Sequence, residues 1–464
     1  MLRRNVLCSL MIALSGAFCL LATGSLFSEA CGAEGSVKTD LSGIHVLDLE
    51  TARKIALEDS PSLDAAEARV RQAKEQIWQV RSSYLPRLSA TGSAARSTLS
   101  DNAYSEKLLV NPGADDTTDT YRVGLTATWT LFDGFSREYS ALNARHGMES
   151  TQEARRNVQR LLLSSVANSF YNAQLAQENI AIAESNASFN QRQLDEATAK
   201  YRVGTGSMSD VLNFQVQINS ATSNLIDAKN SYTVALYGLA ALMGIPDAML
   251  PGHIELAALE MEREAELLSP DQGAAIDYAL AHRPDVQQAQ HTVARSQASV
   301  GSARSGFFPT VSLSGTMDAT ETDNRDFETD DFGNSISLGV SIPIFTGGYN
   351  RAKVAEAMAG VRESESGLEE TLINLRAEVS TATSALSAAQ EQLTLQRSNA
   401  ELVQQVRDLV AKEYNAGQTS LVRLNEAQKD LVTAQGNLAR SLVSMRGAWV
   451  SLRAATGEIL TLVD

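Results

Sequence analysis

An internal duplication constrains the fold of this 464-residue chain more than any other feature. Pro61 and Pro284 both follow a short helical segment, and their offset of 223 residues is repeated by Pro86 and Pro309. Later landmarks keep an offset of 213 residues, so one loop is ten residues longer in the first half. The later pairs are Leu131–Gly134 with Ile344–Gly347, Tyr201–Gly204 with Tyr414–Gly417, and Leu242–Gly244 with Ala455–Gly457. Two copies of one structural unit are therefore expected.

Each copy contains two segments in which apolar residues alternate with small or polar ones. The alternation runs through residues 88–94, 121–131, 310–317 and 335–344. A period of two over about ten residues is typical of strands with lipid on one side and water on the other. We therefore expect β-hairpins at 87–131 and 310–345. A soluble hairpin with one buried face has the same pattern, but the polar, acidic loops Thr98–Thr120 and Asp318–Asn334 are typical of extracellular loops.

Very long helices are expected because helix-breaking residues are rare in most of the chain. No proline lies between Pro112 and Pro246, and none follows Pro343. The predicted long helices are 134–203, 207–243, 348–415 and 419–456. A helix of roughly 70 residues is about 100 Å long. In the third of them, apolar residues recur in alternating steps of three and four, which indicates a coiled-coil seam: Leu372, Leu375, Val379, Ala382, Leu386, Ala389 and Leu393.

The first residues have the pattern of a secretory signal peptide. Two arginines precede an apolar run from Val6 to Leu21, and small residues follow. We expect a signal peptide at 1–30, with cleavage near Ala30 or Ala33, and an uncleaved anchor helix is the alternative. Cys31 is then the only possible cysteine of the mature chain and a candidate for lipid attachment.

The rest of the chain divides at the repeated landmarks. Repeat 1 is predicted at 48–247 and repeat 2 at 270–457, with a linker at 248–269 between them. Each repeat is expected to contain a short helix, a second helix, a β-hairpin and two long helices. The fold class is therefore mostly α with a small membrane β part, in which long antiparallel helices form a coiled-coil tube, or α-barrel.

Four membrane strands per chain imply an oligomer. Four strands cannot close a barrel, and an open sheet edge is not tolerated in lipid. Three copies supply a twelve-stranded β-barrel, and a ring of three is a common closed symmetry. The sequence thus predicts a homotrimer in contact with outer-membrane lipid, whose helical tube extends into the periplasm.

The duplicated layout resembles the TolC-like outer-membrane efflux protein family, the outer-membrane channels of tripartite efflux and type I secretion systems. The resemblance rests on the Tyr-x-x-Gly turns at Tyr201–Gly204 and Tyr414–Gly417, and on the Phe-x-Gly segments at Phe132–Gly134 and Phe345–Gly347. It implies a homotrimeric exit duct in a Gram-negative outer membrane. It also implies two partners, namely a periplasmic adaptor (membrane fusion) protein and an inner-membrane pump of the RND or ABC type.

The same resemblance assigns roles to the two turns between long helices. They would be periplasmic tips that dock onto the adaptor, and glycine permits the left-handed backbone that a tight turn needs. That they are only turns is the alternative. The docking residues implied are Arg202, Val203, Gly204, Thr205, Ala416, Gly417 and Gln418.

A pore gate is implied just beyond the tips. The best-known family member has two aspartates here in the second repeat, and this chain has Arg423 and Glu426 at those positions. The two side chains can pair instead of repelling, so the ring would have a weaker cation preference. Asp210 of the first repeat would lie within reach of Tyr414, and Thr419 replaces a basic residue of the relative.

Asp210 also has a purely structural interpretation. Ser207 and Asp210 have the spacing of a capping box at a helix start, and an acid in the first turn is favoured by the helix dipole. Capping and gating are compatible.

The sequence indicates neither an enzyme nor a nucleic-acid-binding protein. The formal net charge is -16, whereas phosphate binding needs clustered Lys and Arg. We expect the five histidines to be isolated from each other and from cysteine, and no catalytic or phosphate-binding motif is present. We therefore expect no catalytic residue, no cofactor and no metal site. The alternative function is a periplasmic coiled-coil rod or adaptor without a pore, which leaves the alternating strands unexplained.

Overall fold

The computed structural model describes residues 41–462. Residue contacts separate a unit that ends at Gly43 from a second unit that begins at Ile44, and only the second is described below. The predicted signal peptide, its cleavage sites and Cys31 lie outside the described residues. In the part of the chain that the structure describes, no helix is both long enough and apolar enough to cross a membrane.

Both halves of the chain fold into the same series of elements. The first half contains α2 (Leu49–Asp59), α3 (Pro61–Ser82), β2 (Arg87–Thr98), β3 (Thr117–Phe132), α5 (Ser136–Arg202) and α6 (Met208–Leu242). The second contains α7 (Gln272–His282), α8 (Pro284–Ser305), β5 (Thr310–Thr322), β6 (Gly333–Ser341), α9 (Tyr349–Asn415) and α10 (Leu421–Thr456). Between the halves lie short elements, including β4 (Glu255–Leu256), which pairs in parallel with β1 (Val46–Leu47). The expected mostly helical fold with four longer strands is confirmed.

Local chemistry explains where the paired helices begin. Pro61 and Pro284 occupy the first helical positions of α3 and α8, where the missing backbone N–H costs nothing. The side chains of Asp48 and Asp271 cap α2 and α7 by accepting hydrogen bonds from backbone N–H groups. In each half a single residue, Ser60 or Arg283, separates the short helix from the proline that starts the next helix.

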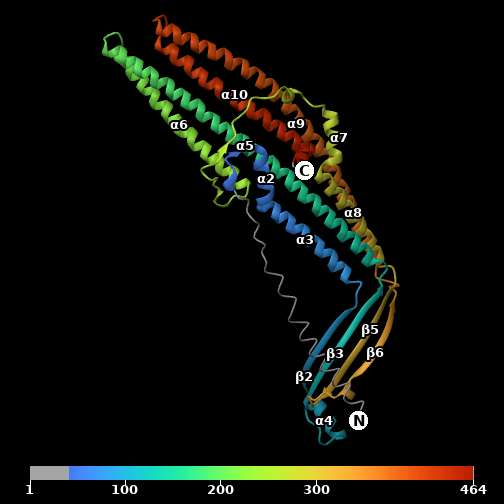
Figure 1. Ribbon diagram of the computed structural model, residues 1–464. Helices are drawn as coiled ribbons and strands as arrows, with labels where there is room; N and C mark the ends of the chain where they lie inside the picture. Colours follow the sequence, from blue (N-terminus) through green and yellow to red (C-terminus); the bar gives the residue numbers. More distant parts are fainter. Residues whose placement is uncertain (1–40, 463–464) are drawn as a thin grey trace. The chain divides into compact units, whose positions relative to one another are not determined.

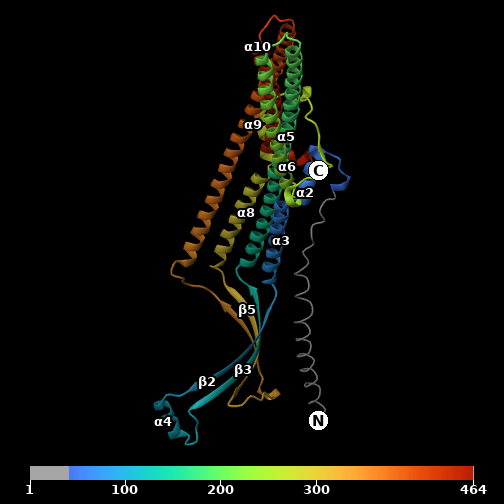
Figure 2. The ribbon, with the colours of Figure 1, turned by 90° about the vertical axis from the view of Figure 1, so that its left-hand side faces the viewer.

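The four strands form one antiparallel sheet in the order β2-β3-β5-β6. This order places β2 and β6 at the two edges, and the central pair joins the two halves of the chain. Figures 1 and 2 show the sheet at one end of the unit and the turns between the long helices at the other.

Two details of the strands differ from the sequence prediction. Strand β6 ends at Ser341, so Ile342 and Ile344 are not part of it, because Pro343 lacks the N–H that a ladder requires. The polar loop between β2 and β3, for which no helix was predicted, contains helix α4 (Asp101–Val110), capped by the Ser100 side chain.

Helices pack side by side along the unit. The main contacts join α5 with α6, α9 with α10, α5 with α8, α8 with α9, α3 with α5, and α5 with α10. In α9 the predicted coiled-coil seam is confirmed, since its leucines and Val379 are nearly inaccessible to solvent, with Leu372 partly buried. Alanines alternate with these larger residues, which lets α10 approach closely and contribute Leu442, Met445 and Leu452.

Candidate functional site

The two turns between long helices have matching backbone geometry. Gly204 and Gly417 adopt φ of +79° and +72°, which is the left-handed region that favours glycine. The N–H of Thr205 donates to the carbonyl of Lys200 at 3.0 Å, and the N–H of Gln418 donates to Glu413 at 2.8 Å. Each bond satisfies a helix-terminal carbonyl that would otherwise lack a partner.

All of the predicted tip residues are exposed. In the first turn these are Arg202 to Thr205, and in the second Ala416 to Gln418. The apolar side chain of Val203 is 74% exposed, and that of Val422 beside the second turn is 75% exposed. The tips therefore present apolar groups that nothing within the described chain covers.

The predicted gate residues Arg423 and Glu426 form an ion pair one turn apart on α10. Nη1 of Arg423 donates to Oε2 of Glu426 at 3.0 Å, and both side chains are more than half exposed. The backbone N–H of Arg423 also donates to the Ser420 hydroxyl, which caps α10. The structure thus brings the two charges together within one chain.

Tyr414 and Asp210 lie close enough to interact electrostatically, but no hydrogen bond joins them in the described part of the chain. Partial burial raises the pKa of Tyr414, and the negative charges of Asp210 and Glu196 raise it further. The ammonium of Lys200 lies 5.5 Å from the centre of the Tyr414 ring. Within residues 41–462, Asp210 therefore lies near Tyr414 without a hydrogen bond to it, and the ammonium of Lys200 also lies near the ring.

The predicted capping box at Ser207 is only partly formed. Ser207 is the N-cap of α6, but its hydroxyl accepts from the N–H of Ser209 and not from that of Asp210. Among the described hydrogen bonds, none returns from the Asp210 side chain to the cap. Asp210 is therefore free for other contacts.

A polar and an apolar contact join the two helical hairpins behind the tips. The amide of Asn425 on α10 donates to Oδ1 of Asn213 on α6 at 2.9 Å. Beneath it, Phe214 and Leu424 are fully buried in a cluster that also includes Phe189 of α5. These contacts hold the tips of one chain together, and no sequence pattern predicted which residues would meet.

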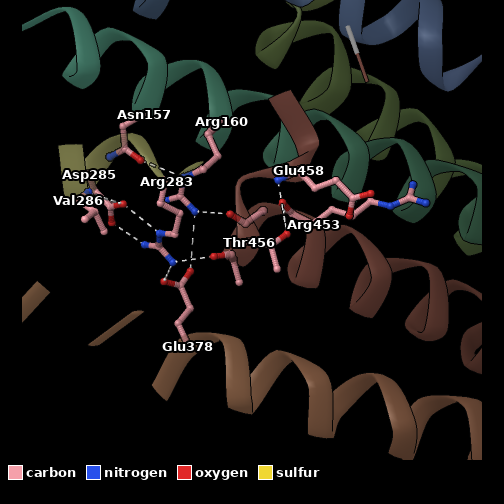
Figure 3. A network of polar contacts seen from close by, with 11 residues as sticks. Asn157, Arg160, Arg283, Asp285, Val286, Glu378, Arg453, Thr456 and Glu458 are labelled. Atoms are coloured by element: carbon pink, nitrogen blue, oxygen red, sulfur yellow. Dashed lines mark hydrogen bonds and ion pairs between the residues drawn. The ribbon is translucent and has the colours of Figure 1, made fainter. Parts of the chain in front are cut away.

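A buried arginine network, which no sequence pattern predicted, lies where α8 begins and α10 ends (Figure 3). Arg283 donates to both carboxylate oxygens of Asp285, to Glu378 on α9 at 2.6 Å, and to the carbonyl of Ala455 at 3.0 Å. Arg160 of α5 donates to the carbonyl of Ala454 at 2.6 Å. Two arginines thus complete the last carbonyls of α10, where a positive charge is favoured.

Asp285 stays ionised within this network. Burial alone would raise the pKa of its carboxyl, but the hydrogen bonds and charge of Arg283 outweigh it and lower the pKa. The only signal in the sequence was an arginine directly before Pro284 in one copy of the repeat, where the other copy has Ser60.

The prediction that the histidines are isolated is wrong in two places. The rings of His146 and His291 stack with centroids 6.1 Å apart, and those of His45 and His253 are 6.0 Å apart edge to face. Each pair joins residues that are far apart in the sequence, so spacing alone could not reveal it.

Comparisons with known proteins agree with this architecture. The family model described as "Outer membrane efflux protein" matches residues 52–245 and 275–458, one stretch in each half of the chain. The pyoverdine export outer membrane protein OpmQ of Pseudomonas aeruginosa is 28% identical over 417 residues, which cover 88% of this chain and 85% of OpmQ. The cation efflux system protein CusC of Escherichia coli is 26% identical over 411 residues, 87% of this chain and 84% of CusC.

Solved structures share the fold. A crystal structure of CusC superimposes with a TM-score of 0.74 at 23% identity and covers 89% of this chain and 93% of CusC. The CmeC outer membrane channel of Campylobacter jejuni also gives a TM-score of 0.74, at 18% identity, and covers 88% of this chain and 85% of CmeC.

The fold and the family match define a channel-type protein of the outer membrane. The chain belongs to the outer membrane efflux protein family. Its predicted role as an outer-membrane exit duct of an export system, extending into the periplasm, is confirmed. Members of this family are channels and not enzymes.

Proposed function

We propose that three copies of this chain assemble into one continuous duct. The edge strands β2 and β6 each have a strand on one side only within the described chain. Unpaired backbone groups are costly in lipid, so pairing β6 of one copy with β2 of the next removes both edges. Three copies then close a twelve-stranded barrel, a size within the range of bacterial barrels.

The different side chains on the two faces of β6 support the proposed barrel. Ile336, Leu338 and Val340 are 83%, 64% and 61% exposed, and their alternation places them on one face. On the other face, hydroxyl pairs link β6 to β5: Ser337 with Ser314 at 2.7 Å, and Ser335 with Thr316 at 2.8 Å. An apolar outer face and a hydroxyl-lined inner face suit a wall between lipid and water.

At the other end, the Arg423–Glu426 pairs would form the ring that narrows the pore. Three internally neutralised pairs repel each other less than three bare carboxylates, so the ring can close with little electrostatic cost. A neutral ring also gives less preference for cations over anions. Asp210 and Tyr414 would lie one helix away and help to hold the closed state.

The exposed tips support docking onto other proteins of an export system. Arg202, Val203, Gly204 and Thr205 on one turn, and Ala416, Gly417 and Gln418 on the other, would meet a periplasmic adaptor. The adaptor would connect the duct to an inner-membrane pump of the RND or ABC type. Relatives are named for pyoverdine export, toluene efflux and cation efflux, so cargo varies on this architecture and we assign none.

Single-channel conductance in planar lipid bilayers tests the duct and its gate together. We expect the detergent-purified wild type to form channels of small conductance. The Arg423→Ser/Glu426→Ser variant should conduct more, because the paired side chains no longer fill the narrow ring. Asp430→Ser/Arg440→Ser, which removes the same two charges from exposed sites further along α10, is the matched control and should resemble the wild type.

Two results would contradict the proposal in different ways. Folded protein that never forms channels argues against a conduit and favours the alternative of a coiled-coil rod or adaptor without a pore. Channels whose conductance is equal in all three proteins leave the duct intact but remove Arg423 and Glu426 from the gate.

A further inference from the structure

Three metal-binding side chains from the two halves of the chain meet between α5 and α8. Nδ1 of His146 lies 2.9 Å from Oε2 of Glu149, one turn away on α5. Nδ1 of His291 on α8 lies 3.2 Å from the same oxygen. The three ligand atoms are all within 4.8 Å of one another, and no other such group occurs among residues 41–462.

These separations are close to those of a coordinated ion. Bonds of 2.0–2.1 Å from Zn²⁺ to nitrogen and oxygen, arranged as a tetrahedron, place neighbouring ligand atoms about 3.3 Å apart. Two of the three separations, at 2.9 and 3.2 Å, are already near that spacing. Three protein ligands leave a fourth position for water, and two imidazoles favour zinc, copper or nickel over magnesium and calcium.

We propose that His146, Glu149 and His291 form a binding site for a divalent transition-metal ion of the zinc and copper class. The three side chains are 24%, 23% and 34% exposed, so an ion can reach them from solvent. The site needs no other chain, because all three ligands belong to one copy.

A neighbouring arginine orients the carboxylate of Glu149 for metal binding. Nε of Arg145 donates to Oε1 at 3.1 Å, which orients the carboxylate and leaves Oε2 toward the two imidazoles. The positive charge of Arg145 repels a bound cation and so lowers the affinity for the metal ion, but Arg145 does not block Oε2, the proposed ligand oxygen.

None of the three ligands is among the residues that line the large groove beside α5 and α8. That groove, with a volume of about 660 Å³, is lined by Gly147 of α5 and Arg295 of α8, among others. Glu149 is about 200° around the helix from Gly147, at 100° per residue. A bound ion would bridge α5 and α8 and would tie the first repeat to the second.

Metal titration of the full-length protein tests the site. The protein is purified in detergent without a polyhistidine tag, stripped with a chelator, and titrated calorimetrically with Zn²⁺. We expect one Zn²⁺ per chain and a rise in unfolding temperature. In parallel, Co²⁺ should produce visible absorption bands that indicate coordination by protein ligands.

Matched histidine variants locate the ion. His146→Gln and His291→Gln should each weaken Zn²⁺ binding at least about tenfold and abolish the Co²⁺ bands. His282→Gln, which removes an exposed histidine on α7, should bind as the wild type does. Circular dichroism of each metal-free variant confirms that it is folded, and either of the two site variants suffices if the other misfolds.

Two outcomes overturn the proposal. One is the absence of a Zn²⁺ isotherm and of Co²⁺ bands for the wild type, which would make the cluster a polar contact between two helices. The other is binding that survives both His146→Gln and His291→Gln, which would place the ion elsewhere.

Discussion

At the scale of single residues, glycines with left-handed backbone end several helices, but their surroundings differ. Gly244 after α6 has φ of +75°, and a Cβ there would lie 2.2 Å from the backbone oxygen of Asp59. Gly417 at the second tip has φ of +72° and nothing within 4 Å of that position. The first glycine is therefore required by both conformation and space, and the second by conformation alone.

We expect Gly244→Ala to destabilise the chain much more than Gly417→Ala. The shared left-handed conformation costs about 1 kcal/mol in both variants. The backbone clash at Gly244 adds about 1–3 kcal/mol, because α2 must move away from the end of α6. Thermal unfolding in detergent, followed by circular dichroism, measures the difference, and equal shifts for the two variants would contradict it.

The buried arginine network gives a prediction about pH. The pKa of Asp285 is lowered in the folded chain from its ordinary value of 3.8, so its contribution to stability is present above that value. That contribution is lost as the pH falls through the lowered folded pKa. We expect Asp285→Asn to be about 2 kcal/mol less stable at pH 7, because a hydrogen bond to a charged group is lost.

Unfolding temperatures from pH 7 down to pH 3 check this expectation. The gap between wild type and Asp285→Asn should narrow toward the acid end. Asp64→Asn is the control, since Asp64 is an exposed acid in the first turn of the equivalent helix α3. A gap that is independent of pH would show that the charge of Asp285 does not matter.

At the scale of elements, most of the buried residues of α9 belong to its coiled-coil seam. Leu386 is fully buried on the seam, whereas Leu395, on the same helix, is 70% exposed. We expect Leu386→Ala to cost about 2–5 kcal/mol, because it removes buried surface and leaves a cavity. Leu395→Ala should change stability little. Denaturant unfolding of both variants measures the loss of unfolding free energy. Similar losses for the two variants would mean that burial within one chain does not decide the stability of α9.

Elements were predictable where their pattern is periodic. The runs without proline indicated long helices, and α5 and α9 are each 67 residues long. The start of α3 at Pro61 followed from one residue with a fixed φ. Helix α4 was missed because it has no buried residue and hence no apolar stripe. The exact boundaries of the repeats and of the signal peptide remain predictions.

At the scale of the whole molecule, the proposed barrel requires that the two faces of β6 meet different solvents. We expect Leu338→Arg to hinder outer-membrane assembly, because a charge facing lipid costs about 2–4 kcal/mol near the bilayer midplane. Ser337→Arg places the same side chain on the opposite, hydroxyl-lined face. It should assemble as the wild type does but change the ion selectivity of the channel.

Membrane fractionation and semi-native electrophoresis measure assembly, and bilayer recordings measure selectivity. Equal assembly of the Leu338→Arg and Ser337→Arg proteins would argue against a lipid-facing row at Ile336, Leu338 and Val340. Loss of trimers in both would indicate that β6 tolerates no large side chain on either face.

The sequence by itself determined the duplication, the alternation of helix and strand, and the seam of α9. These features depend on neighbours within a few residues, and a period of two or of three and a half can be recognised without knowing what lies opposite. It also led to the correct family, since the repeated turns and landmarks keep their order.

Only the tertiary structure decided which faces meet. His146 joins His291, Arg283 joins Glu378, and Asn213 joins Asn425 because separate helices pack side by side. Periodicity shows that a helix has a face, but it does not specify the partner or the axial position of that partner. For this reason the Arg423–Glu426 pair, one turn apart, was foreseen, whereas the histidine cluster and the arginine network were not.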